Sequence, residues 1–225
     1  RVETVGEFPS QIAALERDHS GQLWAGSVFE TGLIRLRRRL FHTIKEPVRG
    51  SVIHGVYADS VGTVWTGSQS GAYRIGKGTA THWTAENGLT NSDVYAVHRD
   101  DTGVLWLSTG DGVFRRREGE LGRVRFWKNQ PFQGFSAMHR DSRGTLWIGG
   151  LFGGLFRYRE GTLRRVLSPE SFDGTGVLAL HHSSDGTLWI GTGGKGVARY
   201  RNGSLTWYGR DDGVPYGRVR DIHET

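Results

Sequence analysis

The sequence of 225 residues contains no cysteine, one methionine and five prolines, and no apolar run in it is long enough to span a bilayer. Without cysteine there is neither a disulfide framework nor a thiolate metal site. Long stretches with a period of 3.6 residues are also missing, which excludes a helical solenoid. Glycine, in contrast, is abundant at 35 residues, and it suits a fold with many tight turns.

Tryptophan gives the chain its organisation. Five tryptophans recur at intervals of 41, 41, 41 and 42 residues, each with a glycine three places before it: Trp24, Trp65, Trp106, Trp147 and Trp189. The hexapeptide GTLWIG occurs twice, at residues 144–149 and 186–191. A period near 40 residues, with short β-like runs and glycine turns, is typical of a propeller blade. The sequence therefore predicts an all-β fold, a β-propeller of five blades with four antiparallel strands each.

The repeat also predicts where blades and strands lie. We expect one propeller domain, because repeats of one kind bury their faces against their neighbours. Its blades should span about 10–48, 49–90, 91–132, 133–174 and 175–216, and residues 217–225 should start a further inner strand. In the fourth copy the expected strands are residues 135–140, 145–149, 155–159 and 162–167.

Aspartate stands six residues before the tryptophan in the first four copies, at Asp18, Asp59, Asp100 and Asp141. The fifth copy has Ser183 at this place and Asp185 two residues later. A carboxylate there can accept hydrogen bonds from the backbone of a turn. Because the residue recurs in successive blades, we predict a structural rather than a catalytic role.

Histidine also follows the repeat, at His98, His139, His181 and His223, with Glu16 and Tyr57 in the two earlier copies. Metal ligands must converge to about 2 Å from one ion, whereas equivalent residues of separate blades are expected to splay apart. The pattern therefore predicts structural hydrogen bonding, with no metal site and no cofactor.

Arginine dominates the basic residues, providing 25 of the 29, and many arginines fall on the third strand of a copy or the hairpin after it. Charged outer strands discourage pairing between sheet edges. A nucleic-acid site would instead need a continuous basic stripe with exposed stacking aromatics. We therefore expect no nucleic-acid partner, although the net charge of +6 is compatible with an anionic ligand.

The loops that differ between copies are the candidate ligand site. In a propeller, the loop between the second and third strands and the loop into the next inner strand emerge on one face, and binding residues concentrate on loops of a rigid scaffold. Amides, charges and aromatics there suit a sugar or a peptide better than a lipid. The predicted ligand-binding residues are Gln11, Phe29, Arg49, Gln69, Asn91, Asp93, Asp111, Gln133, Phe152, Thr175, Lys195, Tyr216 and Arg218.

Two segments resemble the two-component regulator propeller repeat: residues 86–94 (ENGLTNSDV) and 99–106 (RDDTGVLW). Residues 212–216 and 188–200 repeat parts of the same pattern, whereas Ser108 and the pair Gly149 and Gly150 depart from it. The resemblance implies the periplasmic sensing region of a bacterial membrane-bound sensor histidine kinase, often a hybrid one, and several such regions recognise oligosaccharides. It also implies a following β-sandwich domain, membrane span and kinase as partners in the parent protein.

Blade number and function leave alternatives open. Propellers of this family commonly have seven blades, so the five copies form either an arc of a larger propeller or a smaller ring, and both chain ends read as lying within a blade. A non-catalytic ligand-sensing module is favoured, and a homodimer is compatible with it. The rivals are a protein-interaction scaffold and a propeller enzyme of the virginiamycin B lyase or glycosidase type. An enzyme would have Glu30, Asp93 and Asp111 as its acidic candidates, and no histidine is expected to join them.

Overall fold

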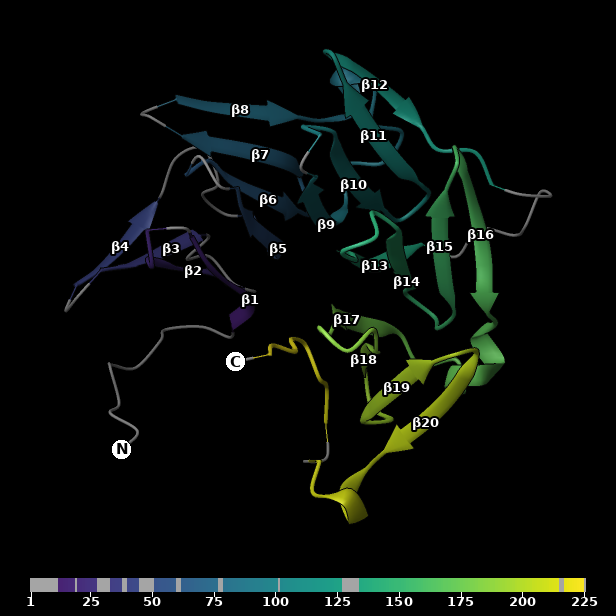
Figure 1. Cartoon of the computed structure of the whole chain (residues 1–225). Coiled ribbons are helices and arrows are strands. Elements are labelled where there is room, and N and C mark those ends of the chain that lie inside the picture. The colour runs from purple at the N-terminus through teal and green to yellow at the C-terminus, as the bar shows by residue number, and fades with distance from the viewer. Residues whose placement is uncertain are drawn as a thin grey trace. The chain divides into compact units, whose positions relative to one another are not determined.

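The computed structural model describes residues 12–18, 20–27, 33–37, 40–44, 51–59, 62–76, 79–100, 102–126, 134–214 and 217–224. Five sheets of four antiparallel strands each make up this part of the chain, and in every sheet the spatial order of the strands follows the sequence (Figure 1). This confirms the predicted all-β propeller architecture.

The chain divides into two compact units, Arg1–Arg99 and Asp100–Thr225. The first unit contains two whole sheets: β1 (Ile12–Arg17), β2 (Leu23–Ser27), β3 (Leu33–Arg37) and β4 (Leu40–Ile44), then β5 (Ile53–Ala58), β6 (Val64–Ser68), β7 (Gly71–Gly76) and β8 (Thr79–Trp83). The boundary between the units falls inside the third sheet, after its first strand β9 (Val94–Arg99). The predicted single domain and its blade limits stay predictions.

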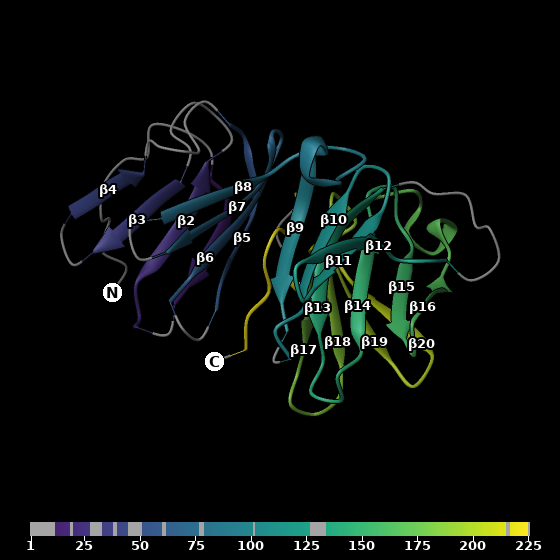
Figure 2. The same ribbon diagram turned by 90° about the horizontal axis from the view of Figure 1, so that it is seen from above.

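The second unit holds the remaining strands of the third sheet and two whole sheets, which Figure 2 shows from above. They are β10 (Leu105–Thr109), β11 (Val113–Arg117) and β12 (Glu120–Arg123), then β13 (Phe135–Arg140), β14 (Leu146–Gly150), β15 (Leu155–Arg159) and β16 (Thr162–Leu167), then β17 (Val177–His182), β18 (Leu188–Thr192), β19 (Val197–Arg201) and β20 (Ser204–Tyr208). In the fourth copy, three of the four predicted strands have the predicted bounds, and the second lies one residue later.

The register explains why an arginine recurs on the third strand. Each repeat tryptophan lies opposite an arginine of that strand, as in the pairs of Trp65 with Arg74 and Trp189 with Arg199. The Arg74 guanidinium carbon lies 5.8 Å from the centroid of the Trp65 ring. At this distance the cation is attracted to the face of the indole. The arginine therefore serves the sheet as well as the charged outer rim.

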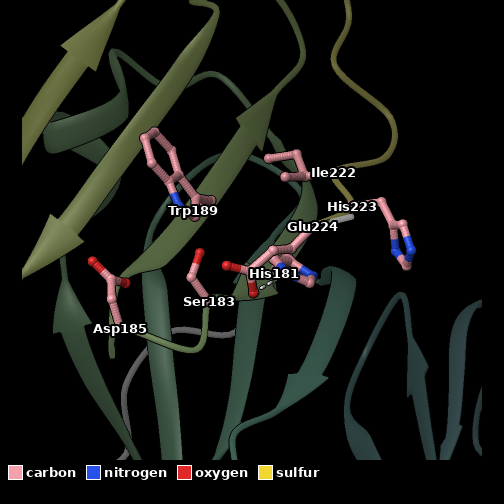
Figure 3. A pocket seen from close by; sticks show the side chains of 7 residues that line it. All are labelled: His181, Ser183, Asp185, Trp189, Ile222, His223 and Glu224. Carbon is pink, nitrogen blue, oxygen red and sulfur yellow. Dashed lines mark ion pairs between the residues drawn. The ribbon is translucent and has the colours of Figure 1, made fainter.

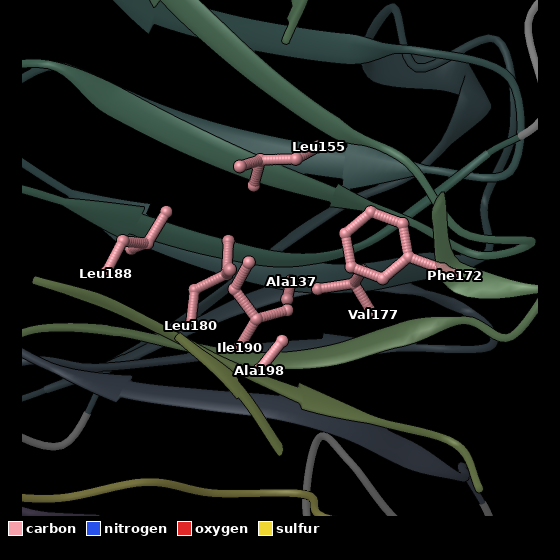
Figure 4. Close-up of a cluster of buried hydrophobic side chains, with 8 residues drawn as sticks. All are labelled: Ala137, Leu155, Phe172, Val177, Leu180, Leu188, Ile190 and Ala198. Carbon is pink, nitrogen blue, oxygen red and sulfur yellow. The ribbon is translucent and has the colours of Figure 1, made fainter. Parts of the chain in front are cut away.

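The hydrophobic core lies between the faces of adjacent sheets. One cluster lies between the fourth sheet of the chain (β13–β16) and the fifth (β17–β20), both in the second unit. It includes Leu155, Phe172, Val177 and Ile190, all fully buried (Figure 4). The sheets approach so closely there that a Cβ atom added to Gly149 would lie 2.3 Å from Cγ1 of Val177. Glycine after the repeat tryptophan thus sets the spacing of the sheets.

Short 3-10 helices follow three of the outer strands. η1 (Ala85–Asn87) and η2 (Pro169–Phe172) lie in the connection to the next inner strand, and η3 (Arg210–Asp212) follows β20 ahead of residues 217–224, in which no strand is formed. Thr84 caps η1, because its side chain accepts a hydrogen bond from the Glu86 amide while Asn87 accepts one from the Thr84 amide. No helix within the described residues is long and apolar enough to cross a membrane.

Candidate functional site

The repeated aspartates hold the blades together. Oδ2 of Asp18, Asp59, Asp100 and Asp141 accepts a hydrogen bond from the indole N–H of the tryptophan six residues later, at 2.9, 3.2, 2.9 and 2.9 Å. Their Oδ1 atoms accept backbone N–H groups of the following turn. The predicted structural role is confirmed, and the bond to the indole adds to it.

The next inner strand supplies a cation to two of these carboxylates. Arg99 donates to Asp59 at 3.0 Å, and Arg140 forms an ion pair with Asp100. Burial alone would raise the pKa of Asp100, but hydrogen bonds from Thr102, Trp106 and Val104, together with the charge of Arg140, outweigh it and lower the pKa. Asp100 is therefore ionised and fully engaged, which leaves it unsuited to proton transfer.

The repeated histidines contact one another instead of splaying apart, which corrects the expectation from the sequence. The ring centroids of His139 and His181 are 5.5 Å apart, and those of His181 and His223 are 6.1 Å apart. His139 Nε2 accepts the backbone N–H of His182 at 3.2 Å, as expected of a structural histidine. Among the described residues, no group of three or more His, Asp or Glu side chains is arranged to hold a metal ion.

The two loop sets that differ between copies do meet at one edge of the sheets. The loop after the second strand donates a backbone hydrogen bond to the segment that enters the inner strand of the same sheet. This contact recurs from Gln69 N to Val52 O at 3.1 Å, from Leu151 N to Gly134 O at 3.2 Å and from Gly193 N to Gly176 O at 2.9 Å. We call this side of the sheets the loop edge.

In the first unit, the loop edge carries a hydrogen-bonded group of four side chains. Asp93 Oδ1 lies 2.8 Å from His54 Nε2, and Asp93 Oδ2 accepts the Tyr95 hydroxyl at 2.8 Å. Asn91 Oδ1 accepts the backbone N–H of Asp93 at 2.8 Å. His54 and Asp93 keep 25% and 33% of their side chains exposed, so a ligand can reach them. Two predicted residues, Asn91 and Asp93, are thereby brought together.

The electrostatics of this group favour hydrogen bonding to a ligand over proton transfer by the tyrosine. Burial, the hydrogen bond to Asp93 and the negative charge of Asp93 raise the pKa of Tyr95 to about 12. The phenol therefore stays protonated at neutral pH and donates to Asp93. Because an ionised carboxylate only accepts hydrogen bonds, His54 Nε2 carries a proton toward Asp93. In the neutral imidazole this leaves Nδ1 as an acceptor for a ligand hydroxyl.

In the second unit, Lys195 is the centre of a second group at the loop edge. Its Nζ atom lies 2.6 Å from Asp173 Oδ2 and 4.3 Å from the centroid of the Trp207 ring. Phe152 is 60% exposed, an unusual state for a large apolar side chain. Thr175 donates its backbone N–H to Phe172 O in the connection that η2 occupies. An exposed aromatic ring and a cation with a carboxylate partner are suited to a polar ligand with an apolar face.

The other predicted ligand-binding residues do not form a group of contacting side chains at the loop edge. Asp111 accepts the Thr109 hydroxyl at 2.8 Å, so it supports its own loop. Gln69 and Arg218 are exposed. Five predicted ligand-binding residues and one acidic candidate lie outside the described residues: Gln11, Phe29, Arg49, Gln133, Tyr216 and Glu30.

The structure adds four residues to the loop edge that sequence reasoning missed: His54, Tyr95, Asp173 and Trp207. In particular, a histidine does join Asp93, contrary to expectation. The signal was present, because His54 and Tyr95 occupy the same place in copies two and three, and Ala13 and Ser136 occupy it in copies one and four. A position that changes so much between copies serves one blade rather than the repeat.

The comparisons with known proteins agree with this fold. Residues 88–111 match the family model described as two component regulator propeller. No curated protein is significantly similar in sequence to the chain. Among solved structures, the extracellular domain of the hybrid two component system BT3049 from B. thetaiotaomicron has 20% identity and a TM-score of 0.77, over 92% of this chain and 30% of that one.

Two other solved structures also have a similar fold. The extracellular domain of the hybrid two component system BT4673 from the same organism has 19% identity and a TM-score of 0.67, over 95% of this chain and 35% of that one. A catalytically inactive virginiamycin B lyase from Staphylococcus aureus, with quinupristin, has 17% identity and a TM-score of 0.74, over 88% of this chain and 69% of the lyase. The chain thus spans about a third of the two hybrid-system domains. It is a β-propeller that carries a two component regulator propeller repeat at residues 88–111.

Proposed function

We propose that this chain is the non-catalytic, ligand-sensing propeller of a bacterial two-component sensor kinase. In this proposal, a carbohydrate-like ligand binds at the loop edge, and its occupancy is relayed to a kinase that is not in this chain. The family match at residues 88–111 and the similarity of fold to extracellular domains of hybrid two component systems support the proposal. Its setting would be extracytoplasmic, in the periplasm, and its partners the rest of the sensor kinase and, in a dimer, a second copy.

One observation carries the proposal: residues that repeat and residues that vary have different tasks. The repeated Asp59 and Asp100 are occupied by turn amides and indoles inside their blades. The variable His54, Asp93 and Lys195 lie at the loop edge and keep part of their side chains exposed. Carboxylate and imidazole groups can bind the hydroxyls of a sugar, and an exposed ring such as that of Phe152 can stack on a sugar ring. Binding would act by favouring the arrangement to which the ligand binds better.

The test is a thermal-shift and calorimetric screen of the chain with neutral and anionic oligosaccharides, in which each sugar is analysed for turnover. We expect a saturable rise in Tm with the sugar left unchanged. Phe152→Ala should weaken the binding of the hit at least tenfold by removing an exposed aromatic contact. Leu23→Ala, which truncates an exposed apolar residue at the opposite end of a second strand, is the matched control and should leave binding unchanged.

A folded protein that no oligosaccharide stabilises would refute the carbohydrate part of the proposal and favour a protein-interaction scaffold. Equal loss of binding in Phe152→Ala and Leu23→Ala would place the ligand elsewhere than at the loop edge.

A propeller enzyme is the second candidate, and the pairing of His54 with Asp93 is the observation that favours it. A carboxylate 2.8 Å from one imidazole nitrogen orients the ring and leaves the other nitrogen free to take a proton from a substrate. The fold is also similar to that of virginiamycin B lyase, at 17% identity, and this lyase is an enzyme.

The variant His54→Asn separates the two candidates. Turnover of a screened compound that falls by a factor of about 10² or more in this variant, while binding persists, would establish His54 as a general base. In a sensor, no compound is turned over, and the substitution changes affinity alone.

A further inference from the structure

A hollow of about 380 Å³ lies at the opposite edge of the fifth sheet, beside the turn that joins β17 to β18 (Figure 3). The inner strand contributes His181, the turn Ser183, and the second strand Trp189. The segment 217–224 supplies Glu224. The loop-edge groups are at the other end of the strands, so this hollow is a separate feature of the molecule.

The other copies show what normally fills this place. Where the fifth copy has Ser183, each of the first four has an aspartate whose carboxylate accepts the indole N–H of the repeat tryptophan and the amides of the turn. Three of these tryptophans have an exposed fraction of 6% or less: Trp24, Trp65 and Trp106. The first four copies therefore show how a carboxylate binds beside the repeat tryptophan.

The fifth copy divides the two tasks of that aspartate. Asp185 takes over the turn, accepting the Thr187 amide at 2.9 Å and the Thr187 hydroxyl at 3.0 Å. No residue takes over the tryptophan: within the described part of the chain, the indole N–H of Trp189 and the hydroxyl of Ser183 have no hydrogen-bond partner. The fifth copy therefore lacks the carboxylate that the other copies have at this position, but it keeps the Trp189 indole N–H that such a carboxylate would accept.

A third polar group at this place also lacks a hydrogen bond. His181 Nε2 is buried without a hydrogen-bond partner among the described residues, and the nearest carboxylate oxygen, Glu224 Oε2, is 4.0 Å away. A buried polar nitrogen without a partner is unfavourable, so a ligand that supplies a hydrogen-bond partner here is favoured. Figure 3 shows His181, Ser183 and Trp189 around the same space.

We propose that this hollow binds the carboxylate of a small organic acid. One ligand oxygen accepts the indole N–H of Trp189, as Asp141 Oδ2 does for Trp147, and the other accepts the Ser183 hydroxyl. The two acidic residues at the rim do not prevent this, because each already has donors of its own. Arg201 donates to Asp185 at 2.9 Å, and Ser184 donates to both oxygens of Glu224 at 3.1 Å.

The volume of the hollow indicates how large the organic acid is. A volume of about 380 Å³ exceeds what a carboxylate alone occupies and falls within the range of about 300–1,000 Å³ of small-molecule sites. An acid with several carbon atoms and hydroxyl groups, such as a sugar acid, can place its carboxylate on Trp189 and its remaining atoms toward the rim.

The test follows the indole N–H resonance of Trp189, assigned with Trp189→Phe, during titrations with acetate and gluconate. Acetamide and glucose are the neutral counterparts. We expect both anions to shift this resonance with saturation, and gluconate to do so at a lower concentration. Ser183→Asp places the chain's own carboxylate in the hollow, so it should weaken anion binding at least tenfold and move the resonance toward those of the other repeat tryptophans.

The converse variant keeps the test decisive if Ser183→Asp does not fold. Asp141→Ser opens the same place beside Trp147, and a new acetate-dependent shift of the Trp147 indole would support the proposal. An equal response to acetamide, a response that persists in Ser183→Asp, or no response to either anion at 100-fold excess would overturn it. The loop-edge ligand is unaffected by any of these outcomes, because the two sites share no residue.

Discussion

The aspartate before each repeat tryptophan makes more contacts than a turn residue needs. Asp100 alone accepts hydrogen bonds from Thr102, Val104 and Trp106 and pairs with Arg140 of the next inner strand. One residue thus fixes a turn, orients the indole and joins two sheets of the second unit. Such convergence explains why the residue recurs where a neutral turn former would serve the turn alone.

We expect Asp100→Ala to lower the free energy of unfolding by about 2–4 kcal/mol, because it leaves several buried donors and a guanidinium without an acceptor. Urea unfolding followed by tryptophan fluorescence measures the change. Asp211→Ala, an exposed substitution in η3, is the control and should stay within about 0.5 kcal/mol. If both variants were equally stable, the proposed role of the carboxylate would be wrong.

These carboxylates also make stability depend on pH. For Asp18, Asp100 and Asp141, burial raises the pKa, but the hydrogen bonds outweigh it and hold the pKa below the ordinary value of 3.8. Between the lowered pKa and 3.8, the unfolded chain binds protons that the folded chain does not, so unfolding is favoured there. The stabilisation is complete above about pH 5 and is lost as the pH falls through the folded-state pKa.

Melting curves between about pH 6 and pH 2 measure this loss. Asp141→Asn removes one of the three titrating groups and should have a shallower fall in Tm on acidification than the unsubstituted protein. A slope that does not change in this variant would mean that Asp141 does not contribute to the acid sensitivity.

At the scale of the strand, the sequence predicted the four strands of the fourth copy, three of them to the residue and β14 one residue too early, because each strand is specified locally. The alternation of apolar and polar residues and the flanking glycines located β13, β15 and β16 to the residue. Only some residues of the candidate site could be predicted from the sequence. Asn91 and Asp93 follow from the loop pattern, but their partner His54 lies 39 residues away from Asp93 on the preceding inner strand. No local pattern encodes that contact, since it depends on how neighbouring sheets are staggered.

The packing of neighbouring sheets is sensitive to a single methyl group. A Cβ atom at Gly149 would clash with Cγ1 of Val177, whereas one at Gly122 meets nothing within 4 Å. Both glycines are in strands of the second unit and neither has a positive φ angle. We therefore expect Gly149→Ala to cost about 1–3 kcal/mol by overpacking and Gly122→Ala to be nearly neutral. Thermal unfolding of the two variants compares them directly, and an equal Tm would show that the sheets can move apart freely.

The charge of the whole molecule bears on which ligand the loop edge prefers. A net charge of +6 raises the local concentration of anions around the protein and speeds their association. Repeat architecture fixes the scaffold from sequence alone, whereas this preference depends on charges summed over the chain and on loops that vary between copies. An acidic oligosaccharide is therefore expected to bind more tightly than a neutral one of equal length.

Salt separates this long-range attraction from direct contacts. Raising the NaCl concentration from about 0.1 M to about 1 M shortens the Debye length from about 10 Å to about 3 Å. We expect the affinity for an oligogalacturonate to fall by roughly tenfold over this range, because charges further than about 3 Å from the ligand are then screened. A neutral galacto-oligosaccharide of the same length should bind almost equally at both salt concentrations. Isothermal titration calorimetry measures both, and an acidic ligand whose affinity is independent of salt would show that direct uncharged contacts, and not the net charge of the protein, hold it.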